Sequence, residues 1–312
     1  MDMTNLVNSK TYINGNTKVT IDLATGTKIR FTEDDEFKPE FAESCDVHIS
    51  DCCDNGCEFC YAGCSINGKL GELINWKFFD SLHPWTEMAI NLQEPIPNDI
   101  WIFLNKMKEK NVIVNATVNQ RHFMRREFQS DLSIFKKAGL IHGIGISVTD
   151  PTPEFIEKVK EFDNVVLHVI NGIVTTEQLH KLAHNGFKIL ILGYKEIGRG
   201  AGYIEDPEQA KLVKNRKGFL YWNLKYIIDQ KWFSRIAFDN LALEQLNPHR
   251  FVDDGTWEHI FQGEDGTSTF FINLVDGTFG KNSLSTKEER IPIGDKSIDE
   301  MFEIVKGGMR IG

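Results

Sequence analysis

The sequence lacks cysteine over most of its length, and this absence narrows what its cysteines can do. All six cysteines lie between positions 45 and 64, and none follows Cys64. Disulfide bonds within so short a segment would do little to restrain the rest of the chain. The clustering therefore favours a metal or an iron–sulfur cluster over a disulfide framework.

Long apolar runs are also missing. Runs such as KILILGY have the length of a strand and are too short to span a bilayer. The N-terminal stretch MDMTNLVNSKTYINGN is polar and has no apolar segment of the kind that a secretory signal needs. We therefore expect a cytoplasmic protein that does not bind a membrane.

The composition shows no excess of positive charge. The net charge is −10 at pH 7, which argues against a nucleic-acid polymer as partner, because such partners select a basic surface. Apolar residues make up 41% and charged residues 26% of the chain, an ordinary globular mixture. The 312 residues suffice for a sizeable core.

Strand-like and helix-like segments alternate through the middle of the chain. The first predicted helix covers residues 71–82, and a later one lies near 206–216. Such β-α units build a parallel sheet with right-handed crossovers, either doubly wound or closed into a full or partial barrel. Unbroken apolar runs favour strands covered on both faces. The predicted strands lie at residues 46–50, 86–93, 112–118, 143–150, 164–170 and 188–194.

The flanking regions read differently from this core. TKVTIDL and TKIRF, joined by ATGT, predict a short N-terminal β-hairpin. After the sixth strand the alternation weakens, and STFFINLVDGTFG and SIDEMFEIVKG predict strands and a terminal helix. We expect an N-terminal hairpin segment at 1–45, the core at 46–235 and an α+β extension at 236–312.

The spacing of three cysteines narrows the kind of site. Cys53, Cys57 and Cys60 form the pattern C-x3-C-x2-C on the loop after the first predicted strand. Parallel α/β folds bind ligands where strands end. Three thiolates are one fewer than a closed zinc site or an ordinary iron–sulfur cluster requires. A cluster with three protein ligands would keep an open position, as a catalytic site needs.

This loop resembles that of the radical S-adenosylmethionine (SAM) enzymes, whose hallmark is C-x3-C-x-aromatic-C. Here Phe59 is the aromatic residue. The resemblance implies a partial (β/α)6 barrel like part of a TIM barrel, and a [4Fe–4S] cluster held by Cys53, Cys57 and Cys60. It also implies that SAM is cleaved reductively to a 5′-deoxyadenosyl radical that abstracts hydrogen from a substrate. The phrases DVHISDCCDNGC and ILGYKEIGRG are similar to a phage and bacterial subgroup whose substrates are unassigned.

The same resemblance suggests residues that bind SAM. The second predicted strand ends in Leu92-Gln93-Glu94-Pro95, which keeps the Glu-Pro of the family's Gly-Gly-Glu-Pro turn but lacks both glycines. Phe59 would pack near the adenine and Glu94 would receive the methionyl amine. The remaining expected contacts are Gln93 beside Glu94, Ser147, Thr149 and Asp150 at the ribose, and Gly193 and Tyr194 at the adenine.

The substrate is left open by the sequence, and a peptide, a nucleoside or nucleotide and a small metabolite all remain. Three polar residues that follow the third strand could orient the substrate, namely Asn119, Gln120 and His122. Helix capping and loop hydrogen bonding are the equal alternative for these side chains. Asp239 is a further candidate at a strand end. The lack of C-terminal cysteines weakens the case for a peptide. The resemblance implies a one-electron donor such as flavodoxin or ferredoxin.

Two features invite other interpretations. GRGAG, at 198–202, lacks the spacing of a phosphate-binding loop and predicts a mobile loop over the barrel mouth; Lys195 and Arg199 could meet an anion or face solvent. The alternative function is a non-catalytic zinc-binding interaction module. Its tetrahedral site would use Cys53, Cys57, Cys60 and Cys64, with Cys45 or Cys52 as substitutes.

Overall fold

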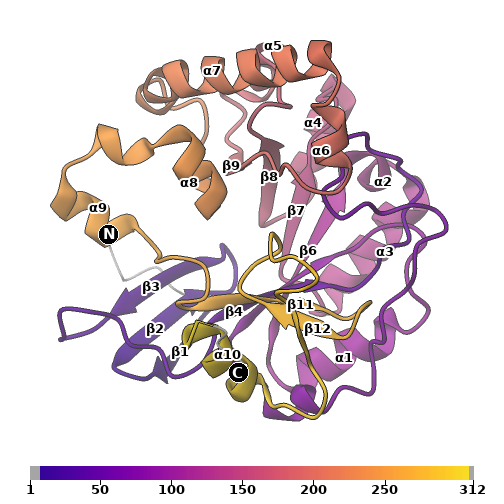
Figure 1. Cartoon of the computed structure of the whole chain (residues 1–312), viewed down its shortest axis with the longest axis vertical. Coiled ribbons are helices and arrows are strands. Elements are labelled where there is room, and N and C mark those ends of the chain that lie inside the picture. Colours follow the sequence, from indigo (N-terminus) through magenta and orange to yellow (C-terminus); the bar gives the residue numbers. More distant parts are fainter. Residues whose placement is uncertain (1–7, 309–312) are drawn as a thin grey trace.

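The computed structural model describes residues 8–308 and is built around a ten-stranded sheet (Figure 1). The strand order is β10-β9-β8-β7-β6-β5-β4-β11-β12-β13, and every neighbouring pair from β10 to β11 is parallel. The strands β4 to β9 are Ser44–His48, Glu87–Asn91, Ile113–Asn119, Gly143–Ser147, Val165–Ile170 and Lys188–Leu192. The six predicted strands and the α/β class are thereby confirmed.

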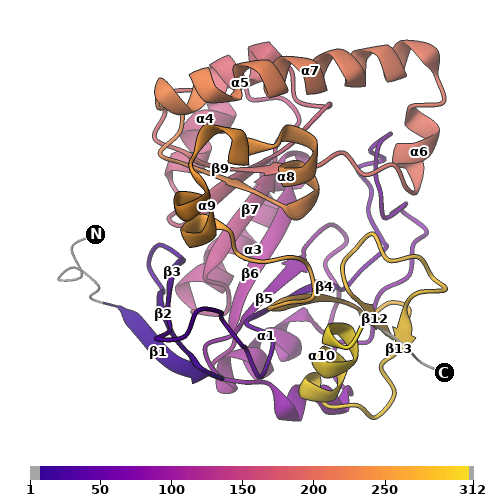
Figure 2. The same ribbon diagram turned by 60° about the vertical axis from the view of Figure 1, so that its left-hand side comes forward.

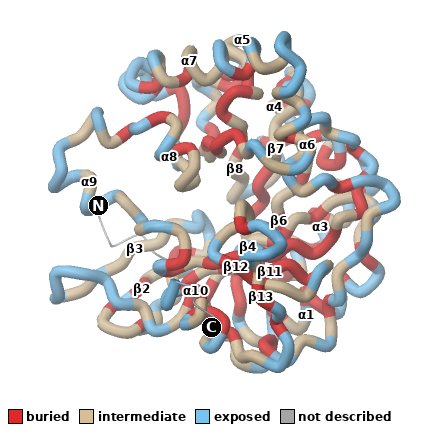
Figure 3. Tube along the Cα trace, in the orientation of Figure 1, coloured by how far each residue is buried: buried red, intermediate tan, exposed pale blue. Residues whose placement is uncertain are grey.

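Helices cover one face of this sheet. Those that follow β5 to β9 are α1 (Ile100–Glu109), α2 (Gln120–Phe123), α3 (Arg126–Lys137), α4 (Pro153–Lys160), α5 (Thr176–Leu182), α6 (Arg199–Tyr203) and α7 (Pro207–Asp229). Buried side chains from the sheet and from α1, α3, α4, α5 and α7 form one apolar core. In Figure 3 the buried residues follow the strands and the sides of the helices that face them.

The two faces of the sheet differ in polarity, and this corrects the expectation of strands covered by helices on both faces. Along β6, Val114, Ala116 and Val118 are buried in the core. Asn115 and Thr117 alternate with them and line a cavity on the opposite face. Successive strand residues point to opposite faces, so the same alternation gives the sheet one apolar face and one polar face.

The N-terminal segment forms a separate antiparallel sheet rather than a hairpin alone. The predicted hairpin is present as β2 (Thr17–Asp22) and β3 (Thr27–Phe31), and β1 (Ser9–Asn14) adds a third strand that we did not predict. This sheet and α7 lie at opposite ends of the molecule (Figures 1 and 2). Part of the N-terminal stretch that argued against a secretory signal, residues 1–7, lies outside the described residues.

The C-terminal segment returns to the main sheet. It contains β10 (Arg235–Phe238), α8 (Asn240–Leu246), η3 (Pro248–Phe251), α9 (Asp254–Ile260), β11 (Thr269–Asn273), β12 (Thr278–Gly280), β13 (Ile291–Pro292) and α10 (Ile298–Lys306). β11 pairs in parallel with β4. The domain boundaries at 45 and 235 stay a prediction.

Two predicted helices are wrong in extent. The segment 71–82 contains only the 3-10 turn η2 (Lys77–Ser81), because the Glu72 carboxylate accepts hydrogen bonds from the backbone of Ile74 and Asn75 and holds a loop instead. The helix predicted near 206–216 continues to Asp229 as α7. Within residues 8–308 no helix combines the length and apolar character needed to cross a membrane.

Candidate functional site

The cysteine loop leaves the carboxyl end of β4 and closes on itself at its base. The backbone N–H of Ser65 donates to Asp51 (3.0 Å), and that of Cys53 donates to Ser65 (2.9 Å). Within the loop, the N–H of Cys60 donates to the carbonyl of Cys57 (3.2 Å). The three cysteines of the C-x3-C-x2-C pattern therefore lie on one ordered segment.

The thiols of this segment are close enough to influence one another. Burial raises the pKa of Cys53 and of Cys57, and the charge of Cys60 raises both further. A hydrogen bond from the thiol of Cys64 lowers the pKa of Cys60 to about 5 and raises that of Cys64. Three neighbouring thiols on one loop are one fewer than the four that an ordinary iron–sulfur cluster takes, so the residues fit the cluster with one open position that the spacing indicates.

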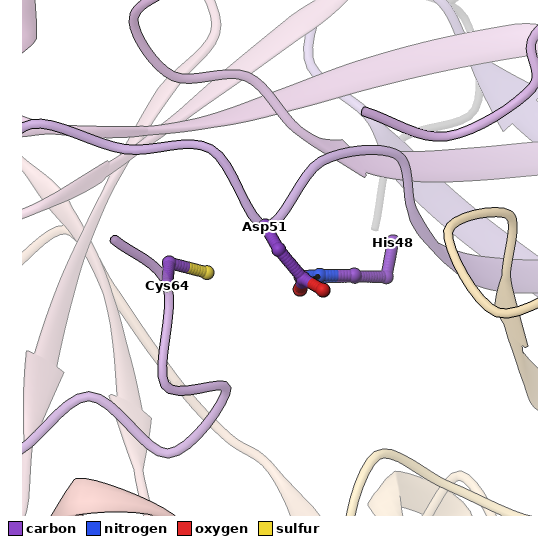
Figure 4. Close-up of side chains that lie close together, drawn as sticks. All are labelled: His48, Asp51 and Cys64. Atoms are coloured by element: carbon purple, nitrogen blue, oxygen red, sulfur yellow. Dashed lines mark hydrogen bonds and ion pairs between the residues drawn. The ribbon is translucent and has the colours of Figure 1, made fainter. Parts of the chain in front are cut away.

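Cys64 also belongs to a second group of possible ligands (Figure 4). The ligand atoms of His48, Asp51 and Cys64 all lie within 4.8 Å of one another, and His48 Nε2 is 2.6 Å from Asp51 Oδ1. His48 and Cys64 are buried. An imidazole, a carboxylate and a thiol at this separation could bind a single zinc ion.

The two remaining cysteines, Cys45 and Cys52, make other contacts. Cys45 is on the core face of β4, and burial raises the pKa of its thiol. The thiol of Cys52 donates to the carbonyl of Ile66 (3.2 Å). Both residues are therefore small buried side chains. Cys45, which faces the core, is a poor substitute ligand for a zinc site.

The end of β5 attaches to the base of the cysteine loop. Asn91 accepts a hydrogen bond from the N–H of Ile49 (2.7 Å) and donates to the carbonyl of Ser50 (2.8 Å). The amide of Gln93, which we expected near the cofactor, donates to the carbonyls of Ser50 (2.9 Å) and Cys52 (3.0 Å). Gln93 thus holds the loop in this structure.

A network of charged residues joins Asp54, which lies between two of the cysteines, to the α2 region. Arg125 donates to Asp54 (2.7 and 3.1 Å) and pairs with Glu94. His122 Nε2 donates to Asp54 (2.7 Å), while its Nδ1 accepts from the N–H of Glu94 (3.4 Å). Arg125 lowers the pKa of Asp54, and burial lowers the pKa of His122, which favours the neutral imidazole.

The residues considered for substrate contact after β6 make internal hydrogen bonds. Asn119 caps α2 by accepting from the N–H of Arg121 (2.8 Å), and its amide lies 3.9 Å from Cys57 Sγ. Gln120 is buried and accepts from the N–H groups of Thr149 (2.8 Å) and Asp150 (2.9 Å). These hydrogen bonds and the burial of His122 agree with the alternative of helix capping and loop hydrogen bonding. Contact of these residues with a substrate stays a prediction.

The end of β9 lies against α8 and α6. The N–H of Gly193 donates to Asp239 (2.8 Å), and a Cβ on Gly193 would lie 2.4 Å from Leu241 Cγ, so this position has no room for a side chain. The hydroxyl of Tyr194 donates to the carbonyl of Gly200 (2.6 Å). Burial raises the pKa of Tyr194 to about 12, so it stays a neutral donor at physiological pH.

A cavity of about 920 Å³ lies on the polar face of the sheet. Its lining includes four of the residues predicted to bind SAM, namely Phe59, Ser147, Gly193 and Tyr194. The other four, Gln93, Glu94, Thr149 and Asp150, are not part of the lining. The site predicted from the sequence is therefore brought together in part around one cavity.

Two polar side chains inside this cavity, those of Asp46 and His168, were missed by the sequence analysis, whereas Lys195 was considered there as a possible contact to an anion. Burial lowers the pKa of His168 to about 4, so this imidazole is neutral at pH 7. Asp46 lines the cavity and has accessible surface there. Partial removal from bulk water raises the pKa of its carboxyl group. Lys195 donates to Ser283 (2.6 Å) and lies over the ring of Tyr61. Period-two alternation along the strands was the signal that could have found Asp46 and His168.

Comparison with known proteins gives structural matches only. No family model matches the chain, and a search of curated proteins found no significant match. The crystal structure of Streptococcus suis SuiB bound to S-adenosylmethionine matches with a TM-score of 0.61 and 12% identity, covering 97% of this chain and 89% of SuiB. SuiB bound to precursor peptide SuiA matches with a TM-score of 0.60 and 11% identity, covering 98% of this chain and 90% of SuiB.

An identity of 11 to 12% carries information on the fold but not on the activity. SuiB is a radical SAM enzyme. The match extends over nearly the whole of this chain, including the segments that flank the predicted core. The fold of this chain therefore resembles that of a radical SAM enzyme, as the cysteine spacing indicated.

Proposed function

We propose that the protein is a radical SAM enzyme. The observation that carries this proposal is the placement of Cys53, Cys57 and Cys60 on one ordered loop at the carboxyl end of β4. Phe59, between two of these cysteines, lines the large cavity, so the loop adjoins a space that can hold a cofactor and a substrate. The resemblance in fold to SuiB supports the same function.

The cluster would be held by Cys53, Cys57 and Cys60. With SAM bound, a [4Fe–4S] cluster supplies the electron for reductive cleavage of SAM, which starts hydrogen abstraction from the substrate. Binding requires thiolates, and burial keeps Cys53 and Cys57 protonated in the free protein. Assembly of the cluster should therefore release protons.

The residues around the cavity would orient SAM. Phe59 and the backbone at Gly193 and Tyr194 would contact the adenine, and Ser147, Thr149 and Asp150 the ribose. Glu94 would receive the methionyl amine, for which it must exchange its present partner Arg125. We also propose that the parallel sheet forms a partial (β/α)6 barrel whose polar face encloses the reaction.

The substrate that we favour is a peptide. SuiB, the structural neighbour, has been crystallised with its precursor peptide SuiA. A cavity of about 920 Å³ is large for SAM alone and leaves space for one substrate side chain. A nucleotide and a small metabolite remain alternatives. Neither would need an opening of the cavity through which a longer peptide chain could continue. A flavodoxin or ferredoxin would supply the electron.

The test is anaerobic purification and reconstitution with iron and sulfide, followed by reaction with dithionite and SAM. We expect about four irons per chain and formation of 5′-deoxyadenosine. Cys57→Ala should abolish both. Cys45→Ala is the control, because Cys45 lies in the core away from the loop thiols, and it should keep its iron. A wild-type protein that takes up no iron would overturn the proposal.

The group of His48, Asp51 and Cys64 supports a second candidate, a zinc-binding protein without catalytic activity. In that case the purified protein would be colourless and would contain one zinc ion. Cys64→Ala should then remove the zinc, whereas Cys53→Ala should leave it in place. For the radical enzyme the two variants should behave in the opposite way toward iron.

A further inference from the structure

The segment that follows β9 packs directly on the cysteine loop. Arg199 makes three hydrogen bonds to it: the guanidinium donates to the carbonyls of Cys57 (2.9 Å) and Cys64 (2.9 Å), and the backbone N–H donates to the carbonyl of Cys60 (3.1 Å). Arg199 is half-buried. One residue therefore binds the main chain at two proposed cluster ligands and at the cysteine beyond them.

The neighbouring contacts show that this attachment is close. Gly198 has a φ of +55°, and a Cβ there would lie 2.1 Å from the carbonyl oxygen of Tyr61. A Cβ on Gly200 would lie 2.3 Å from the carbonyl oxygen of Lys195. Only glycine fits both positions. Gly198 and Gly200 thus serve contact with the cysteine loop and the preceding turn rather than phosphate binding, and the segment contains the ordered helix α6.

Aromatic contacts extend the same interface. The rings of Phe59 and Tyr203 meet edge to face with centroids 6.0 Å apart. Lys195 Nζ lies 3.9 Å from the centroid of the Tyr61 ring. The strands β4 and β9 are separated by β5, β6, β7 and β8 in the sheet. The interface therefore joins loops that the sheet itself keeps apart.

We propose that Arg199 is a positioning residue for the cluster. It sets the main-chain conformation of the cysteine loop before any metal binds, and it places a fixed positive charge beside the cluster. The guanidinium fork suits this task because it can donate to two acceptors at once, which a lysine cannot do in the same geometry. The part that concerns the cluster rests on the proposed function, whereas ordering of the loop does not.

A positive charge near an iron–sulfur cluster favours the reduced form, which carries one more negative charge. Arg199→Gln removes the charge and keeps an amide donor. Arg199→Lys keeps the charge and loses the fork. The first variant should make the reduction potential of the cluster more negative, and the second should leave it near the wild-type value while loosening the loop. If Arg199 had only a structural role, the reduction potentials of the Arg199→Gln and Arg199→Lys proteins would not differ.

The first measurement needs no cluster. Hydrogen–deuterium exchange of residues 53–64 in metal-free protein should become at least about tenfold faster in Arg199→Ala than in wild type, because the loop opens more often. Arg216→Gln is the control, since the side chain of Arg216 on α7 has no hydrogen bond or ion pair within the described residues. Unchanged exchange in Arg199→Ala would overturn the proposed positioning.

The second measurement uses the reconstituted protein. Iron content of Arg199→Ala should fall to less than about half of the four irons expected for wild type, and the potential should shift in Arg199→Gln but not in Arg199→Lys. An unshifted potential in Arg199→Gln would overturn the electrostatic part. If wild type takes up no iron while exchange still rises in Arg199→Ala, the proposed function fails and the ordering of the loop stands.

Discussion

The cysteine loop is held from two sides by different kinds of contact. On the side of β5 and α2, the carboxylates of Asp54 and Glu94 pair with Arg125, which is 38% exposed, and the His122 imidazole pairs with Asp54. On the side of β9, Arg199 donates to backbone carbonyls and glycines allow close packing. The first attachment joins charged groups and depends on salt, whereas the second joins a guanidinium to neutral backbone carbonyls.

This difference separates an exchangeable attachment from a fixed one. Glu94 is paired with Arg125 in the free protein and is the residue proposed to receive the amine of SAM. An ion pair near the surface contributes little free energy and can be exchanged for a ligand contact at small cost. The carbonyls of Cys57 and Cys64 have no such role, so the bonds from Arg199 can persist when the cofactor binds.

The largest effect is expected where the fixed attachment is closest. Gly198→Ala would force a side chain into a left-handed conformation and against the carbonyl of Tyr61. We expect a loss of about 2–4 kcal/mol in the free energy of unfolding, measured by urea denaturation. Gly202→Ala is the matched control, because nothing lies within 4 Å of its Cβ position; it should be neutral or slightly stabilising. Equal effects of the two would show that the contact is unimportant.

A smaller effect is expected from the buried part of the exchangeable attachment. His122→Leu removes a partner from Asp54 and from the N–H of Glu94, and we expect a loss of about 1–3 kcal/mol at pH 7.5. The exposed His259 gives a control, His259→Leu, that should change stability by less than about 0.5 kcal/mol.

The pH dependence of this effect has a definite sign. The pKa of His122 is lowered in the folded protein, so below its ordinary value of about 6.5 the unfolded chain binds more protons than the folded one. The stability contributed by His122 is therefore complete above that pH and is lost as the pH falls toward the folded pKa. The difference between wild type and His122→Leu should narrow between pH 7 and pH 5. A constant difference would show that His122 does not titrate with unfolding.

The parts of this site that the sequence predicts are those encoded locally. The strands follow from apolar runs, and the thiol loop from cysteine spacing. Arg125 was not singled out and Arg199 was considered only as an anion contact, because their partners lie far along the chain and an arginine in a polar stretch is ordinary. The same holds for β11, whose place beside β4 depends on contacts over most of the chain.

The alternation of polar and apolar residues along the strands is a local signal that the sequence analysis did not use. Asn115 and Thr117 alternate with Val114, Ala116 and Val118, which is the period of a strand with one polar face. The prediction of strands covered on both faces gave too much weight to the apolar residues. The cavity that results holds His168 and Asp46, so attention to this period would have located the candidate substrate site.

The smallest effect on stability is expected from Arg125, and it tests the difference between the two attachments of the cysteine loop directly. Arg125→Gln removes the ion pairs with Asp54 and Glu94, and because these groups are partly exposed we expect a loss of only about 0.5–1 kcal/mol at low salt. Screening should reduce this loss in 1 M sodium chloride, whereas the loss from Arg199→Gln should change little. Arg126→Gln, which removes the same charge one residue away without a described hydrogen bond, is the control. If salt abolished both losses, the attachment through Arg199 would be electrostatic as well, and the distinction between an exchangeable and a fixed side of the loop would be wrong.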